Sequence, residues 1–180
     1  MLLRAFAKVR QNSDRPRMVL KLVGYGPLED SLRQLALDLG IAGLVEFAGK
    51  AWQAELPQIY RSADVFILPS AREAWGLVVN EAMLSGLPVV VSDRCGCAVD
   101  LVTAETGWTF SPHDEGELVN VLSRVASTPR AQLERMGSVA RTLSSEYSPE
   151  NCAAVVSQTI AKLAKADRPD GRASIRLPQE

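Results

Sequence analysis

Histidine and cysteine are scarce in this chain, which has one histidine and three cysteines among 180 residues. A small, odd number of cysteines does not make the disulfide framework of a secreted domain, so we expect a reducing, cytoplasmic setting. Cys95 and Cys97 form a Cys-x-Cys pair, but no further Cys or His cluster completes the four ligands of a structural zinc. We therefore expect no metal site. His113 has no nucleophile signature beside it, and a role in a loop or at a helix entry is its default interpretation.

Long apolar runs and an excess of one charge are also missing. No apolar run approaches the roughly 20 residues that cross a bilayer, and the first residues do not form a signal peptide. Twenty basic residues against twenty-one acidic ones leave a formal net charge of -1, without the basic excess typical of nucleic-acid-binding proteins. We expect a cytoplasmic protein without a transmembrane segment or a nucleic-acid partner; peripheral attachment at the inner membrane face stays open.

What the chain does contain is a regular alternation of apolar strands and helical stripes. Its 47% hydrophobic content is enough for an ordinary core. Apolar runs alternate with helical spacing five times, which predicts an α/β fold with a Rossmann-like, doubly wound parallel sheet. Strands are expected at 18–23, 45–47, 64–68, 88–91 and 106–110, and helices at 2–9, 28–39, 55–62, 76–85, 114–125, 129–140 and 149–163.

The chain is organised around residues 68–91, LPSAREAWGLVVNEAMLSGLPVVV. An apolar strand ends there, a loop carrying Glu73 follows, a helix begins near Gly76, and a second strand closes the stretch. This βαβ unit presents its loop at a strand's carboxyl end, where open α/β sheets bind ligands. The free amides and positive dipole end of the helix favour a phosphate or diphosphate, and Gly76 lets the backbone come close to it.

Two carboxylates, Glu73 and Glu81, are expected to flank this anion site. Glu81 lies about a turn and a half inside the helix, and its Cβ leans back toward the helix start. Carboxylates repel a diphosphate itself, but they suit hydroxyl pairs on either side of it, each diol donating two hydrogen bonds to one carboxylate. The spacing therefore favours a nucleotide sugar as the ligand.

The sequence resembles the donor-site signature of retaining glycosyltransferases of family 4 in three runs: Glu73-x-x-Gly76-Leu77, Glu81-Ala82-Met83 and Gly86-Leu87-Pro88-Val89-Val90. Such enzymes have the GT-B fold of two Rossmann-like domains and serve glycan biosynthesis. The resemblance covers residues 2–163 and identifies them as the C-terminal, donor-binding domain. It implies a hexosyltransferase-type activity that uses a nucleoside diphosphate sugar as donor, with no other cofactor.

The resemblance also assigns site residues. Glu73 would be the catalytic candidate and hold hydroxyls of the donor sugar, and Glu81 would bind the ribose diol. The amides around Trp75, Gly76 and Leu77 would meet the diphosphate and the sugar. Trp75 stands where the family usually has Phe.

A second turn resembles the family's Gly-x-Gly-Pro turn beside the nucleotide. It contains Gly24 and Gly26, and a plain tight turn is an equally good interpretation. Residues 48–50 follow the expected strand at 45–47, where family members commonly read the base through backbone atoms. Backbone readout leaves no side-chain signature, so the base stays unidentified.

The chain departs from the family pattern at its start. The acceptor domain, the first strand of the donor domain and the Arg and Lys after that strand have no counterpart here. Without that strand, we expect a seam between the strands that begin at Met18 and Asp64. Residues 1–165 would then form the donor-binding domain, and 166–180, which have no period, a disordered tail. A fragment, a truncated reading frame, or a subunit whose partner chain supplies the missing pieces would each explain this.

Three functions remain after the sequence is read. The first is the donor-binding half of a glycosyltransferase, which we expect to be inactive alone. The second is a non-catalytic module that binds a nucleotide sugar for regulation. The third is a glycosidase, whose paired carboxylates lie about 5–9.5 Å apart across a sugar bond. Glu73 and Glu81 instead flank a helix start, which disfavours the third.

Overall fold

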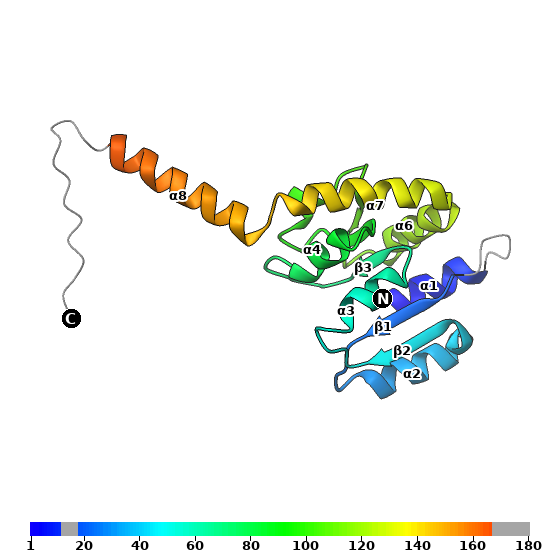
Figure 1. The fold of residues 1–180 in the computed structure, drawn as a ribbon. Coiled ribbons are helices and arrows are strands. Elements are labelled where there is room, and N and C mark those ends of the chain that lie inside the picture. Colours follow the sequence, from blue (N-terminus) through cyan, green and yellow to red (C-terminus); the bar gives the residue numbers. More distant parts are fainter. Residues whose placement is uncertain (12–17, 167–180) are drawn as a thin grey trace. The chain divides into compact units, whose positions relative to one another are not determined.

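The computed structural model describes residues 1–11 and 18–166, and the chain forms two compact units, Met1–Ser144 and Ser145–Glu180. The alternation of strands and helices expected from the sequence is confirmed (Figure 1). The strands are β1 (Leu20–Val23), β2 (Val45–Gly49), β3 (Phe66–Leu68), β4 (Val89–Ser92) and β5 (Gly107–Phe110). The helices are α1 (Leu2–Gln11), α2 (Glu29–Asp38), η1 (Ala42–Leu44, a 3-10 turn), α3 (Leu56–Arg61), α4 (Leu77–Leu84), α5 (Ala98–Leu101), α6 (Glu115–Ser127), α7 (Arg130–Ser145) and α8 (Pro149–Ala166).

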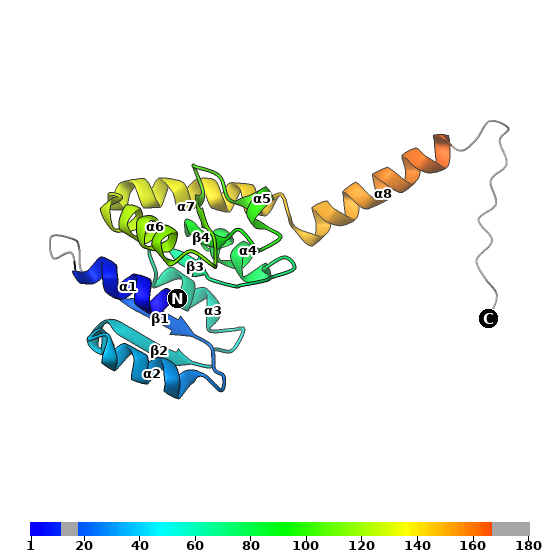
Figure 2. The ribbon, with the colours of Figure 1, turned by 180° about the vertical axis from the view of Figure 1, so that it is seen from behind.

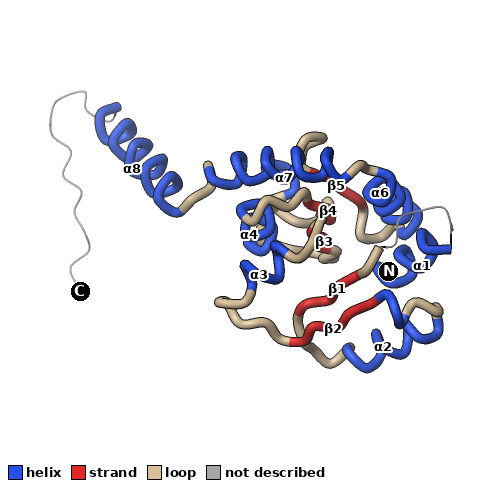
Figure 3. Tube along the Cα trace, turned by 45° about the vertical axis from the view of Figure 1, so that its right-hand side comes forward, coloured by secondary structure: helices blue, strands red, loops and turns tan. Residues whose placement is uncertain are grey.

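All strand pairs are parallel, but they form two sheets (Figure 3). β1 pairs with β2, and β3, β4 and β5 pair in that order. Every residue of β4 is buried, as expected for a Val-rich strand covered on both faces of a parallel sheet. β3, in contrast, is only half-buried along its whole length.

The predicted seam lies between these two sheets. Within the described residues, no ladder joins β1 to β3. In the strand order of a doubly wound fold, a further strand, which the described residues do not contain, would stand between them. The half-buried β3 and the exposed Val19 before β1 fit strands that each lack one neighbour.

The core is closed by α1, whose apolar stripe matches the prediction. Leu3, Phe6 and Val9 are buried, and the helix packs against α6 (Figures 1 and 2). Lys8 on α1 pairs with Glu115 on α6, with Nζ and Oε1 2.7 Å apart. The contact with Lys8, together with more distant cations, lowers the pKa of Glu115. These contacts fix α1 and α6 together over one face of the strands.

α7 supports the turn between α4 and β4. At Gly137 of α7 an ideal Cβ would overlap the carbonyl oxygen of Gly86, so a glycine is needed for the two backbones to approach. An Arg141 side-chain nitrogen donates to the carbonyl oxygen of Ser85 at 3.2 Å. The helix that carries Glu81 is therefore held at its C-terminal end.

The second unit contains α8, which begins as predicted. The Ser148 hydroxyl accepts the amide of Asn151 at 3.2 Å, and Pro149 is the first helical residue. The predicted domain end at 165 lies inside α8. The tail predicted to be disordered lies outside the described residues, except for Ala166, the last residue of this helix.

Candidate functional site

The loop between β3 and α4 is held by the loop after β4. The amide of Glu73 donates to the carbonyl oxygen of Arg94 at 3.1 Å, and the amide of Gly96 donates to the carbonyl oxygen of Glu73 at 3.0 Å. The amide of Cys97 continues the pattern by donating to the carbonyl oxygen of Trp75 at 3.1 Å. These bonds prolong the pairing of β3 with β4 beyond the strand ends, so the loop is part of the sheet framework.

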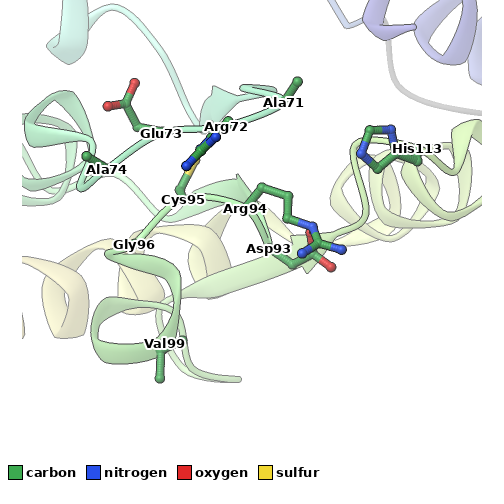
Figure 4. A pocket seen from close by; sticks show the side chains of 10 residues that line it. All are labelled: Ala71, Arg72, Glu73, Ala74, Asp93, Arg94, Cys95, Gly96, Val99 and His113. Atoms are coloured by element: carbon green, nitrogen blue, oxygen red, sulfur yellow. The ribbon is translucent and has the colours of Figure 1, made fainter.

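Glu73 lies at the edge of a pocket of about 630 Å³ (Figure 4). Loop residues 71–74 form one side, and residues 93–96 form the other, so the pocket opens at the carboxyl ends of β3 and β4. His113, which follows β5, also lines it, although the sequence pointed to no site role for this residue. This position, at the carboxyl edge of parallel strands, is the one that the sequence predicted for a ligand.

Gly76 caps the start of α4 in a left-handed conformation, with φ 95° and ψ 61°. An ideal Cβ there would lie 3.2 Å from Leu68 Cδ2 and 3.4 Å from Glu73 Cγ, so the Glu73 side chain starts beside the helix N-terminus. Within the described residues, no acceptor receives the amides of Leu77 and Val78. The first turn of α4 thus offers unpaired donors and a positive dipole end close to Glu73.

Trp75 is anchored by its indole nitrogen. Its Nε1 donates to Asn80 Oδ1 at 2.9 Å, and Asn80 Nδ2 donates to the Ser144 hydroxyl at 3.3 Å. Ser144 is buried and its hydroxyl donates to the carbonyl oxygen of Asn80 at 3.2 Å. A phenylalanine at this position would lack the first of these bonds. Neither Asn80 nor Ser144 was singled out from the sequence.

Glu81 is exposed on α4 and receives a hydrogen bond from Tyr60. The Tyr60 hydroxyl donates to Glu81 Oε2 at 2.9 Å. Burial, reinforced by the bond to Glu81, raises the pKa of Tyr60. Glu81 does not line the pocket beside Glu73. The structure therefore joins Glu73, Trp75, Gly76 and the exposed Leu77 in one loop and helix start, with Glu81 farther along the same helix.

A second pocket, of about 330 Å³, lies at the carboxyl end of β1 and includes Gly24 and Gly26. The Gly24 amide donates to the carbonyl oxygen of Gly49 at 2.8 Å, which ties this turn to the end of β2. Lys50 Nζ lies 4.1 Å from the ring centroid of Trp52 and 5.5 Å from that of Tyr25. The sequence indicated the two glycines but not this cluster, because Tyr25 lies in the loop after β1 whereas Lys50 and Trp52 lie in the loop after β2.

The Cys-x-Cys pair is packed inside the loop after β4. Cys95 and Cys97 are buried, and burial raises the pKa of both thiols, that of Cys97 to about 11. Glu73 is the next largest cause of the shift at Cys95. In the part of the chain that the structure describes, no three His, Cys, Asp or Glu side chains are grouped so that they would hold a metal ion.

Known proteins resemble this chain in sequence. The profile of a family described as glycosyl transferases group 1 matches residues 1–143. A D-inositol 3-phosphate glycosyltransferase of Streptomyces scabiei is 32% identical over 166 residues, which are 88% of this chain and 37% of that protein. The chain spans about a third of the length of the curated relatives it matches.

Solved structures share the fold. Sucrose-phosphate synthase from Thermosynechococcus elongatus has a TM-score of 0.73 at 25% identity, over 92% of this chain and 43% of that one. Anabaena Alr3699/HepE, solved with UDP and glucose, has a TM-score of 0.70 at 26% identity, over 92% of this chain and 44% of that one. GT-B glycosyltransferases thus contain a part that is built like this chain. Across the described residues, none of the helices combines the length and apolarity needed to cross a bilayer.

Proposed function

This chain belongs to the glycosyl transferases group 1 family, and we propose that it is the donor-binding part of a retaining, family 4 enzyme that transfers a hexose from a nucleoside diphosphate. The observation that carries the proposal is the start of α4. The left-handed Gly76 leaves the amides of Leu77 and Val78 without acceptors, beside the Glu73 side chain. Two free amides at a helix N-terminus suit a diphosphate.

Each carboxylate has a separate role in this proposal. Glu73 projects from the loop at the edge of the 630 Å³ pocket and accepts hydrogen bonds from the hydroxyls of the donor sugar. Glu81 lies farther along α4 and accepts the ribose diol. The diphosphate between sugar and ribose meets the helix start. The turn with Gly24 and Gly26, at the end of β1, lies beside the nucleotide.

The reaction needs little covalent chemistry from the protein. The anomeric carbon of the sugar exchanges its bond to a diphosphate oxygen for a bond to an acceptor oxygen, with the configuration retained, and the proton of the acceptor hydroxyl passes to the departing diphosphate. Holding the donor in place and stabilising the departing diphosphate supply most of the rate, and Glu73 is the side chain nearest the reacting sugar in this arrangement. We propose that the amides, and not a metal ion, hold the diphosphate.

The acceptor would bind to a domain outside these 180 residues, on the same polypeptide or on another chain. Support comes from the relatives, of which this chain spans about a third. The chain alone would then bind donor without transferring sugar. When the purified chain is incubated with nucleotide sugars and candidate acceptors, we expect no transfer of sugar. Measurable turnover would contradict this.

A thermal-shift screen tests donor binding. The chain is heated with UDP, GDP or ADP and with their hexose conjugates, at ligand concentrations of at least a hundred times the expected Kd, where binding stabilises by about 2.7 kcal/mol. UDP is the first candidate, because the similar Anabaena structure holds UDP. A rise in Tm with one nucleoside diphosphate, unchanged by EDTA, supports the proposal. No rise with any of them contradicts it.

A further inference from the structure

Tyr60 occupies a fixed position next to Glu81. It is the penultimate residue of α3 and is 9% exposed. Its ring meets that of Phe66 on β3 edge-on, with centroids 5.9 Å apart and ring planes at 68°. The hydroxyl emerges from this packing and donates to Glu81 Oε2 at 2.9 Å. A buried ring therefore delivers one hydrogen-bond donor to an exposed carboxylate on another helix.

We propose that Tyr60 is a positioning residue that orients the Glu81 carboxylate for the ribose of the nucleotide. The inference rests on the proposed function, because it takes Glu81 as the ribose ligand. It assigns to α3 a part in the site that neither the Glu73 loop nor the resemblance to known enzymes indicates.

Glu81 has little else to hold its side chain. Glu81 is exposed. Within the described residues, Tyr60 is the only side chain that donates a hydrogen bond to the Glu81 carboxylate, and no Lys or Arg forms an ion pair with it. A glutamate on a helix surface samples several rotamers, and ordering it on ligand binding costs conformational entropy. A donor fixed by a packed ring reduces that cost before the ligand arrives.

The bond to Tyr60 leaves capacity for a diol. An ionised carboxylate has about four acceptor positions on its two oxygens. Oε2 can therefore accept from Tyr60 and from one ribose hydroxyl, while Oε1 accepts from the other. Burial raises the pKa of Tyr60, so the phenol keeps its proton and remains a donor at any pH at which the protein is assayed.

Tyr60→Phe tests the role of the hydroxyl, since it removes one oxygen and keeps the packed ring. Affinities are measured by calorimetry for the full chain, with UDP, GDP or ADP, whichever binds the wild type, and with the 2′,3′-dideoxy form of the same nucleotide. Tyr60→Phe should weaken the ribonucleotide about threefold to tenfold, as expected for one lost hydrogen bond. The affinity for the dideoxy nucleotide should not change, because that ligand has no diol for Glu81 to bind.

Two controls separate positioning from folding. Tyr147→Phe removes a phenol hydroxyl from the second unit and should change neither affinity. In a Glu81→Ala background, Tyr60→Phe should have no further effect on the ribonucleotide. If wild type and Tyr60→Phe bind the ribonucleotide with equal affinity, this inference is wrong but the proposed function still stands. The same holds if Tyr60→Phe lowers the affinity for the ribonucleotide and for the dideoxy nucleotide equally. A wild-type chain that binds no nucleoside diphosphate would instead overturn the proposed function, and this inference with it.

Discussion

Gly96 lies so close to Ala74 that an ideal Cβ on Gly96 would overlap the Ala74 carbonyl oxygen. The contact is between two backbones, one from the loop before α4 and one from the loop after β4. Flanking hydrogen bonds from Gly96 to Glu73 and from Cys97 to Trp75 depend on this approach. The position of Glu73 is therefore set by a residue that carries no side chain.

Gly96→Ala should destabilise the protein and move the Glu73 loop. The added methyl group would meet a carbonyl oxygen that cannot rotate away, and overpacking of this kind costs about 1–3 kcal/mol. Urea denaturation measures the loss of unfolding free energy, and the same variant should bind donor more weakly. Gly43→Ala is the matched control, since an added Cβ there has no heavy atom within 4 Å. Equal stability of the two variants would show that the loops do not touch as described.

Trp75→Phe should destabilise the protein through Asn80. The substitution removes the indole nitrogen that donates to Asn80 Oδ1 and keeps most of the ring. Losing one hydrogen bond at a half-buried acceptor costs about 0.5–1.5 kcal/mol. Trp52→Phe, at a tryptophan that is 65% exposed, should change the unfolding free energy by less than this. If both variants unfold at the same urea concentration as wild type, the indole bond contributes nothing.

One of the three thiols should react quickly with a disulfide reagent, and the other two slowly. Cys152 is exposed, whereas Cys95 and Cys97 are buried and their pKa values are raised, that of Cys97 to about 11. Because the thiolate is the reactive form and a raised pKa removes it at neutral pH, a disulfide reagent at pH 8 should modify Cys152 first. Raising the pH toward 11 should speed the reaction of Cys97, and urea should expose all three thiols. Three fast thiols in the folded protein at pH 8 would contradict this.

The elements of the fold were predictable because each is encoded locally. The apolar residues of α1 recur at helical spacing, which predicts a helix, and the short valine run of β4 predicts a buried strand. Gly76 marks the start of α4. The four-residue α5 and the short η1 were missed, since neither is long enough to show a helical period.

The site was predictable only in part. Glu73, Gly76 and Glu81 stand out by spacing within one βαβ unit. The bond from Tyr60 to Glu81 joins residues 21 apart, and the bond from Asn80 to Ser144 joins residues 64 apart. No local pattern contains such pairs, because they form only when the helices pack. Gly96 was equally hidden, as a glycine needed for a backbone contact looks in the sequence like any loop glycine.

The central claim is that Glu73 and Glu81 hold different parts of one donor. Calorimetric titration of wild type, Glu73→Gln and Glu81→Gln, each with a nucleoside diphosphate and with its hexose conjugate, tests it most directly. Hydrogen bonds to a charged group contribute about 1.5–3 kcal/mol, so each loss should be about tenfold to a hundredfold. Glu81→Gln should weaken the binding of both ligands, whereas Glu73→Gln should weaken the binding of the hexose conjugate only. If both variants lose affinity for the same ligands, or if neither variant loses affinity for any ligand, the claim that the two carboxylates bind different parts of the donor is wrong.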